Sequence, residues 1–217
     1  MAVSVQKPRE STDERRRAIA AAARALIVEK GFEGLRTRDI AERVGINIAT
    51  LHYHVPTKQA LIALVAETMK DEFRSQSLAR PRAHLSPAER LAHEFADFEE
   101  LLTKRPEVLA VMSELTERAR RDADVRAGVK PMLGRWRTML AEILAAGRDD
   151  GSFRADLDPE MAAQMLVGAL MSFCRAPDQR AAAFARFRAE LIRAIRHPDS
   201  PLSPSPVPRR AAVPVED

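Results

Sequence analysis

The chain of 217 residues is poor in the residues on which several common protein classes depend. It contains one cysteine, Cys174, so an intrachain disulfide and a zinc site built on cysteines are both excluded. Cys174 ends the apolar segment LMSFC, which favours a small buried side chain in a helix core. A redox switch at this thiol is the alternative.

Long apolar runs are also lacking. The longest weakly polar run, residues 162–174, is shorter than the roughly 20 residues that a membrane-spanning helix needs. The first seventeen residues contain no apolar core of a secretion signal. The sequence therefore predicts a cytoplasmic protein that has no membrane partner.

Alternating strand patterns are absent, whereas helical apolar stripes and helix caps recur along the chain. Ser11 with Glu14, and Ser86 with Glu89, have the spacing of capping boxes. Gly31 is expected to end a helix. The sequence predicts an all-α fold of nine helices, over residues 11–30, 37–44, 48–54, 57–79, 86–104, 105–121, 122–148, 158–175 and 178–195.

Positive charge is concentrated at the N-terminal end of the chain. Residues 1–60 hold eleven Lys and Arg against seven Asp and Glu, a surplus of four that equals the net charge of the whole chain. A polyanionic partner for this quarter of the chain is a reasonable inference. Basic termini are common, so the charge alone does not identify the partner.

Residues 37–55 have the pattern of a helix-turn-helix. Two short helices joined by a three-residue turn must cross steeply, which requires a small residue in the first helix, here Ala41. The turn requires a residue that tolerates positive φ, here Gly45. Asn47 is expected to cap the second helix and Pro56 to stop it.

The segment GFEGLRTRDIAERVGINIATLHYHVPTKQAL, residues 31–61, resembles the DNA-binding domain of the TetR family of bacterial transcriptional regulators. His52 stands where the family usually has tyrosine, and Val55 replaces the commoner phenylalanine. The resemblance implies a flexible segment over 1–10, a DNA-binding domain over 11–56, and a helical effector-binding and dimerisation domain over 57–197. A disordered, Pro-rich tail is expected over 198–217.

The resemblance also implies a set of residues that face double-stranded DNA. We expect Thr37 to cap its helix and to meet a phosphate, and Arg38 to reach a guanine edge. Ile48 and Ala49 can touch a thymine methyl group but cannot hydrogen-bond a base. The predicted DNA-binding residues are Arg36, Thr37, Arg38, Asn47, Ile48, Ala49, Thr50, His52, Tyr53, His54 and Lys58.

Two other interpretations of His52 and His54 are a metal site and a catalytic pair. The two histidines are two positions apart on a helix, about 200° around its axis, so they cannot chelate one metal from one face. No Ser, Cys or Asp has the spacing of a nucleophile and its base. We expect neither a metal, nor a cofactor, nor enzymatic activity.

Six later helices with no net charge are expected to form a core, a cavity for a small apolar effector, and a homodimer interface. The candidate cavity residues are Phe95, Phe98, Leu102, Met112, Leu115, Met132, Trp136, Met139, Met165 and Phe173. Segment 158–175 is apolar on nearly all sides, which suggests a four-helix interface between two copies. The candidate interface residues are Met161, Met165, Gly168, Ala169, Phe184, Phe187, Leu191 and Ile195.

Together these features predict a homodimeric repressor that binds a palindromic operator and is released by a small molecule. An activator, or a regulator that takes no small ligand, is a near alternative. A more distant one is a helical lipid-binding protein or enzyme without DNA binding. Four arginines, Arg105, Arg118, Arg120 and Arg121, would suit an anionic effector, but they also fit a solvated helix face.

Overall fold

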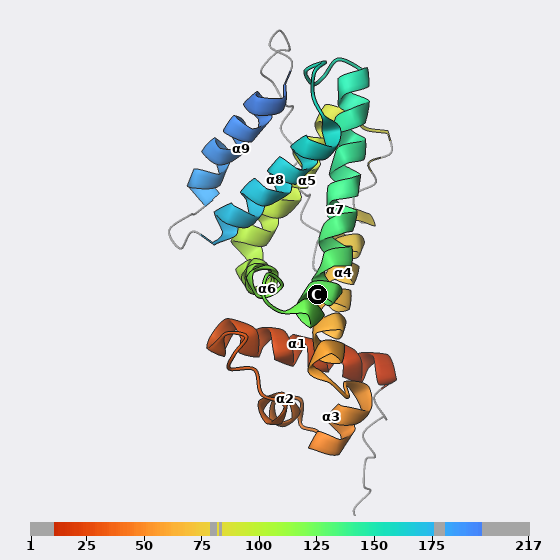
Figure 1. Cartoon of the computed structure of the whole chain (residues 1–217), viewed down its shortest axis with the longest axis vertical. Helices are drawn as coiled ribbons and strands as arrows, with labels where there is room; N and C mark the ends of the chain where they lie inside the picture. The colour runs from red at the N-terminus through yellow and green to blue at the C-terminus, as the bar shows by residue number, and fades with distance from the viewer. Residues whose placement is uncertain (1–10, 79–81, 83, 176–180, 197–217) are drawn as a thin grey trace, which may run out of the picture. The chain divides into compact units, whose positions relative to one another are not determined.

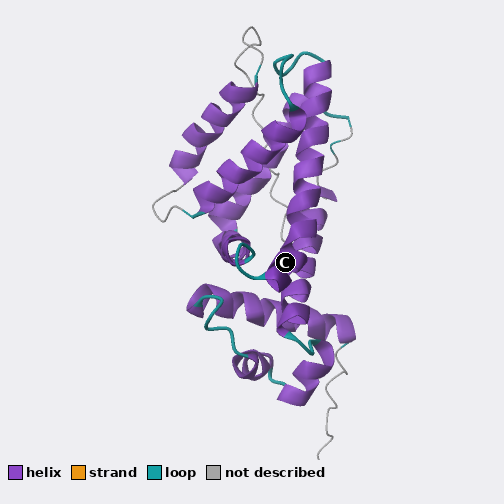
Figure 2. Cartoon of the chain, in the orientation of Figure 1, coloured by secondary structure: helices purple, strands orange, loops and turns teal. Residues whose placement is uncertain are grey.

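The computed structural model describes residues 11–78, 82, 84–175 and 181–196. The segment predicted to be flexible, 1–10, and the Pro-rich tail, 198–217, lie outside the described residues. Across the described ranges the chain is helical and contains no strand (Figure 1, Figure 2). A single isolated bridge joins Phe153 to Arg196. The predicted all-α class is confirmed.

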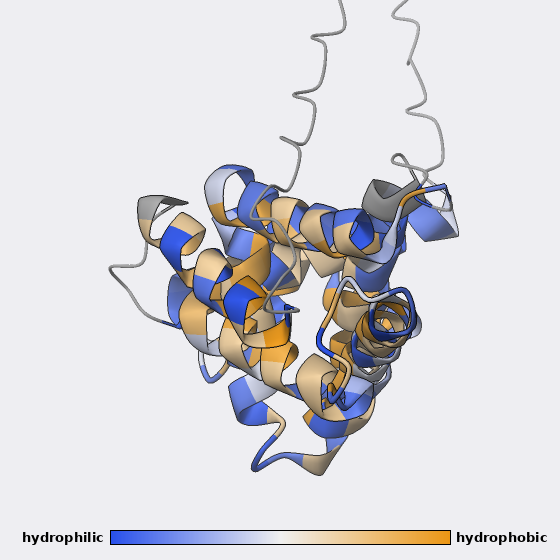
Figure 3. Ribbon diagram, turned by 90° about the horizontal axis from the view of Figure 1, so that it is seen from above, coloured by the Kyte–Doolittle hydropathy of each residue, from blue (hydrophilic) through white to orange (hydrophobic). Residues whose placement is uncertain are grey.

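Each predicted helix is found within a few residues of its expected bounds. The helices are α1 (Thr12–Lys30), α2 (Thr37–Val44), α3 (Ile48–His54), α4 (Lys58–Leu78), α5 (Pro87–Lys104), α6 (Pro106–Arg118), α7 (Ala123–Asp149), α8 (Pro159–Cys174) and α9 (Ala181–Ile195). Figure 3 shows hydrophilic and hydrophobic residues side by side on the helices. Such a mixture gives a helix an apolar side for packing and a polar side for solvent.

Side chains fix the helix starts, as predicted. The Ser11 hydroxyl accepts a hydrogen bond from the Glu14 N–H at 3.2 Å, and the Glu14 carboxylate accepts one from the Ser11 N–H at 2.7 Å. The same reciprocal pair forms at the start of α5. These bonds satisfy backbone N–H groups that have no partner within the helix.

The prediction that Thr37 caps α2 was wrong. Thr37 is the first helical residue, and the cap position belongs to Arg36, which has extended backbone angles and makes no side-chain capping bond. Because a guanidinium carries only donors, Arg36 cannot satisfy the free N–H groups at the start of α2. Those N–H groups remain available to an anion.

The described helices pack into two compact units. The first contains α1–α4, α6 and α7 as far as Leu133, and the second contains α5, α7 from Gly134 onward, α8 and α9. In the first unit, α1 contacts α2, α4 and α6. The domain boundary expected between residues 56 and 57 stays a prediction.

The core of each unit is apolar. In the first unit, Ile19, Leu26 and Leu51 are almost completely buried, and α3 contacts α2. In the second unit the core is aromatic: the buried rings of Phe173 and Phe184 meet edge-on with centroids 5.4 Å apart. Each such buried side chain contributes about 1.5–3 kcal/mol of hydrophobic stabilisation.

The connection between α7 and α8 contributes a core residue that the sequence did not reveal. Phe153 is buried and lies so close to Gly147 that a Cβ there would stand 2.2 Å from the phenyl ring. The Arg154 N–H also donates to the Ile195 carbonyl at 3.1 Å, which ties this connection to the end of α9.

None of the described helices combines the length and apolar character needed to cross a bilayer.

Candidate functional site

Buried apolar side chains and a backbone hydrogen bond hold α2 and α3 together. Ile40 and Ala41 of α2 and Leu51 of α3 are buried, and the Ile46 N–H donates to the Ala41 carbonyl at 2.9 Å to close the turn. Gly45 ends α2 with φ 72°, a left-handed conformation that a Cβ would strain. The positive φ expected of Gly45 is confirmed, and Ala41 is buried where α2 contacts α3.

Helix α3 is short because both of its ends are fixed. The Asn47 side-chain oxygen accepts a hydrogen bond from the Thr50 N–H at 2.7 Å and so caps the start. At the other end Val55 is buried and its N–H donates to the Leu51 carbonyl at 2.8 Å, and Pro56 follows directly. Leu51 and Val55 face inward, whereas Ile48, Ala49, His52 and Tyr53 are exposed on the outward side of α3.

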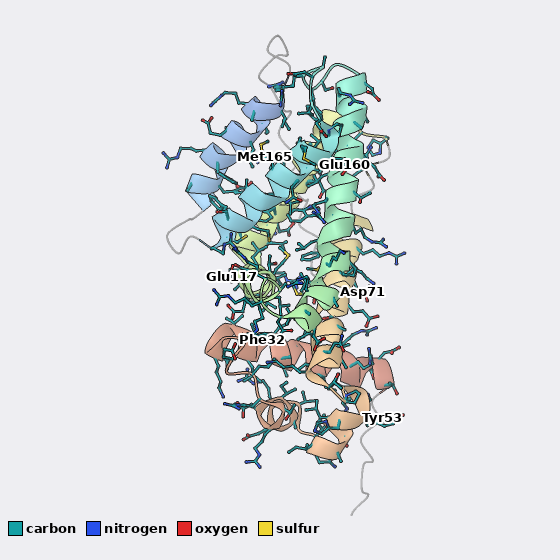
Figure 4. The ribbon with its side chains drawn as sticks, viewed as in Figure 1. Phe32, Tyr53, Asp71, Glu117, Glu160 and Met165 are labelled. Carbon is teal, nitrogen blue, oxygen red and sulfur yellow. The ribbon has the colours of Figure 1, made fainter. Side chains whose placement is uncertain are left out.

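The predicted DNA-binding residues lie in the first unit on this outward side. Thr50 and His54 are half-buried, whereas Tyr53 is 82% exposed and is labelled in Figure 4. The Tyr53 ring meets the His54 ring edge-on, with centroids 5.2 Å apart. The exposed members of the predicted set are Arg36, Thr37, Arg38, Asn47, Ile48, Ala49, His52, Tyr53 and Lys58.

The basic residues of the first unit divide into two groups. Arg43 pairs with both carboxylate oxygens of Glu29, at 2.7 and 2.8 Å, and Lys30 pairs with Asp39 at 2.7 Å. The Lys30 hydrogen bond holds the pKa of the Asp39 carboxyl below its usual value. Arg38 lies exposed on α2 and makes no ion pair within the described chain. Its charge is available to an external anion.

Sequence reasoning missed Arg16 of α1. Its guanidinium donates to the His54 carbonyl at 3.5 Å and pairs with Glu67 of α4 at 3.4 Å. The run of three arginines at 15–17 was the available signal, but nothing in it indicated contact with a helix 38 residues later. Arg16 therefore joins the end of α3 to α1 and α4.

Phe32, in the connection between α1 and α2, links this region to α6. The Lys58 ammonium lies 4.3 Å from the centroid of the buried Phe32 ring, and the Arg118 guanidinium lies 5.4 Å from it. The Phe32 N–H donates to the Glu114 carboxylate at 3.3 Å, and Arg118 pairs with Glu33. Arg118 is therefore not merely part of a solvated face.

A shallow pocket opens beside this link, within the first unit. Three carboxylates and two guanidiniums line it, and two of its residues are among the arginines considered above for an anionic effector. The lining residues are Glu33, Glu114, Glu117, Arg118 and Arg121. Because the three carboxylates outnumber the two guanidiniums, the pocket does not favour an anion. Phe32 and Glu117 are labelled in Figure 4.

The candidate cavity residues do not form one group. Met112, Leu115 and Met132 belong to the first unit, and the others belong to the second. Phe95, Phe98 and Phe173 are buried, whereas Leu102, Trp136 and Met139 are half-buried. Met165 is 44% exposed on α8, so its burial gives no support for a place in the cavity. All of them remain candidates.

The candidate interface residues also differ in their exposure to solvent. Met161 and Met165 are 62% and 44% exposed on α8, and Gly168 is exposed one turn further on. Met165 is labelled in Figure 4. Ala169 and Phe187 are half-buried. The other three are buried in the core of their own unit, and their part in an interface stays a prediction. These are Phe184, Leu191 and Ile195.

Asn47→Ala is expected to lower the free energy of unfolding by about 1 kcal/mol, because the Thr50 N–H loses its capping partner. Asn47→Asp keeps an acceptor at the cap and should unfold like the wild type. It should nevertheless bind DNA more weakly if position 47 lies near phosphates, because it adds a negative charge. Chemical denaturation and DNA titration of both variants separate the two effects. Equal stability of Asn47→Ala and wild type would contradict the capping role.

Cys174 is expected to be unreactive at neutral pH. Burial raises the pKa of its thiol to about 12, so at pH 7.5 only about one thiol in 30,000 is the reactive thiolate. Alkylation by iodoacetamide should be more than about a hundredfold slower in the native chain than in the same chain unfolded in urea. Native and unfolded rates that agree would restore the redox alternative.

The chain matches two models of known families. Residues 19–65 match "Bacterial regulatory proteins, tetR family", and residues 87–171 match "BetI-type transcriptional repressor, C-terminal". The HTH-type transcriptional repressor KstR2 of Mycolicibacterium smegmatis is 28% identical over 142 residues, which cover 64% of this chain and 67% of that protein.

The matches to solved structures of similar fold extend over nearly the whole of those proteins' chains. A transcriptional regulator from Saccharomonospora viridis, described in complex with choline, has a TM-score of 0.70 at 21% identity and covers 85% of this chain and 99% of its own. FadR from Bacillus subtilis, described in complex with stearoyl-CoA, has a TM-score of 0.70 at 19% identity. The match covers 81% of this chain and 97% of the FadR chain. At these identities the likeness concerns the fold alone.

Proposed function

Because the chain belongs to the TetR family of bacterial regulatory proteins, we propose that it represses transcription as a homodimer on a palindromic operator, from which a small molecule releases it. Family membership makes it a DNA-binding transcriptional regulator and not an enzyme. The observation that carries the proposal is the exposed outer side of α2 and α3, on which Arg38 has no acidic partner within the described chain.

On DNA, the N-terminal end of α3 enters the major groove. Arg38 donates to guanine O6 and N7, and Ile48 contacts a thymine methyl group. The free N–H groups at the start of α2, together with Lys58, bind phosphates and supply most of the salt-sensitive affinity. Lys58 is suited to this role because its contact with Phe32 fixes its direction without neutralising its charge.

The exposed face of α8 is the proposed dimer interface. Met161 and Met165 present apolar area to solvent, and nothing lies within 4 Å of where a Gly168 Cβ would stand, so a second helix can approach closely there. In a twofold interface the same patch meets its own copy. The dimer then presents two copies of α3 to successive major grooves, about 34–36 Å apart.

Release by a small molecule requires that its binding and DNA binding oppose each other. Pro56 and Thr57 lead directly from α3 into α4, and Thr57 caps α4 through a 3.0 Å hydrogen bond from the Ala60 N–H. A displacement of α4 is therefore passed to α3. A coupling free energy of about 1–3 kcal/mol is typical of such a switch. The ligands named for the two solved neighbours differ so much in chemistry that neither is transferred to this chain.

A titration of the upstream region of the chain's own gene tests the proposal. A labelled duplex from that region should be bound with an affinity that falls steeply as salt rises, and a footprint should cover two inverted half-sites. A candidate effector should then lower that affinity. Binding that is insensitive to salt, or a footprint without inverted half-sites, would refute the proposed operator mode.

A further inference from the structure

Phe32 is a buried aromatic residue that two cationic side chains approach. It lies in the connection between α1 and α2, is 1% exposed, and is labelled in Figure 4. The Lys58 ammonium lies 4.3 Å from the ring centroid and the Arg118 guanidinium lies 5.4 Å from it. Lys58 is the first residue of α4, and Arg118 is the last residue of α6. One ring therefore joins the end of α6 to the residue that follows α3 and its Pro56–Thr57 link.

Polar contacts from α6 hold the connection that carries this ring. The Phe32 N–H donates to the Glu114 carboxylate at 3.3 Å, and Arg118 pairs with Glu33, the next residue along the chain. Arg118 is in turn paired with Asp122 at 3.5 Å, which limits the directions open to its guanidinium. Helix α1, from which the connection leaves, also contacts α6. The position of the Phe32 ring therefore depends on α6.

Lys58 remains available to an anion while it contacts the ring. Its side chain is exposed and makes no ion pair within the described chain. An ammonium has three N–H donors, so those directed away from the ring can still meet a phosphate. Ordering one long side chain during binding lowers the affinity by a factor of about two to ten. The ring removes part of that cost, because it holds the ammonium in place before DNA arrives.

We propose that Phe32 is a positioning residue for DNA binding, whose ring, held by Glu114 and Arg118 of α6, directs the Lys58 ammonium to a phosphate. Helix α6 thereby contributes to operator affinity although none of its residues touches DNA. The phosphate contact of Lys58 rests on the proposed function. Operator binding can persist without the contribution of Phe32 and α6, so the two proposals are tested separately.

Phe32→Met tests the proposal, because it keeps an apolar side chain in the core but removes the ring. It should weaken operator binding by roughly fourfold to a hundredfold, since Lys58 loses its fixed direction in both protomers of the dimer. Phe32→Tyr keeps the ring and should bind within about twofold of the wild type. Fluorescence anisotropy with a labelled operator measures these affinities.

Phe153→Met is the matched control for the loss of a buried ring. Phe153 also lies in a connection between helices and is 4% exposed, but it belongs to the second unit and contacts neither Lys58 nor α6. Its replacement should lower the Tm much as Phe32→Met does and leave operator affinity unchanged. A loss of affinity in both variants would mean that destabilisation, and not the position of Lys58, weakens binding.

The same substitution in a Lys58→Met chain decides whether Phe32 acts through Lys58. Lys58→Met alone should weaken binding and reduce the salt slope by about one for each protomer. Adding Phe32→Met should then change the affinity by less than about twofold. A merely structural role of Phe32 would weaken binding by the same factor in both backgrounds and would overturn the proposal. An unchanged affinity in Lys58→Met would overturn it as well, because Phe32 would have no phosphate contact to direct.

Arg118→Gln extends the test to α6 and replaces Phe32→Met if that variant does not fold. The change withdraws the guanidinium from the ring and from Glu33, at a side chain that is 33% exposed. It should weaken operator binding at least about twofold in the wild-type background and not at all in Lys58→Met. Arg120→Gln is its control, because it removes the same charge from a guanidinium that is 74% exposed and pairs with Glu117.

The outcomes separate this proposal from the proposed function. Equal losses for Arg118→Gln in both backgrounds, or equal losses for Arg118→Gln and Arg120→Gln, would overturn the role of α6. Salt-sensitive operator binding by the wild type without coupling between Phe32 and Lys58 would remove the positioning role and leave the regulator in place. No operator binding by the wild type would refute both.

Discussion

Arg38→Ala is expected to weaken operator binding by about tenfold to a hundredfold, because a bidentate contact from arginine to guanine is lost. The same change should relax the base preference at one position of each half-site while leaving the folded chain intact, since Arg38 is exposed and makes no ion pair within the described chain. Fluorescence anisotropy with the wild-type operator, and with operators altered at single positions, measures both effects.

Arg43→Ala is the matched control for this prediction. It lies on the same helix and removes the same charge, but its guanidinium already pairs with both oxygens of Glu29. Its effect on operator affinity should be several times smaller than that of Arg38→Ala and should not depend on the base sequence. If the two variants lose affinity equally and uniformly across sequences, Arg38 contributes only charge and does not contact a base.

Met165→Glu is expected to convert the dimer into monomers at micromolar concentration and to lower operator affinity more than a hundredfold. The twofold symmetry places two new carboxylates in one apolar interface, where neither has a partner, and each costs several kcal/mol to bury. Monomers also lose the avidity of two linked half-sites. Sedimentation velocity measures the assembly, and anisotropy measures the DNA binding.

Val28→Glu provides the control for Met165→Glu. Val28 is a large apolar side chain on α1 and is 46% exposed, close to the 44% of Met165. It lies outside the proposed interface, so its replacement should leave the dimer intact. A Met165→Glu chain that remains dimeric would show that the exposed face of α8 is not the interface, and the dimer would then have to form elsewhere.

Local sequence signals predicted the helices well because each depends on residues only a few positions apart. The Asn47 cap, the Ser11–Glu14 and Ser86–Glu89 boxes and the positive φ of Gly45 involve contacts within three or four residues. Thr37 failed for an equally local reason. Arg36 took the extended backbone conformation one residue earlier, so Thr37 was already helical.

The sequence could not reveal contacts between residues far apart in the chain. Arg16 with the His54 carbonyl, Phe32 with Arg118, and Phe153 against Gly147 depend on how helices pack. The burial of three members of the predicted interface set could not be foreseen for the same reason. A stripe such as Phe184, Leu191 and Ile195 looks identical whether it faces its own core or a second copy, and only packing decides between them. The pairing of Arg82 with Glu94 and Asp97 likewise joins residues twelve and fifteen positions apart.

Selection from a pool of random DNA duplexes, followed by titration of the enriched sequence at several salt concentrations, tests the central claim most directly. The account predicts an inverted repeat whose half-sites lie about one helical turn apart or at a related spacing. Each half-site should have guanine at the position whose base preference is relaxed in Arg38→Ala. It also predicts a linear fall of log affinity with log salt. Enrichment of no sequence, or of a single half-site without its inverted copy, would contradict a dimeric regulator that reads DNA through α2 and α3.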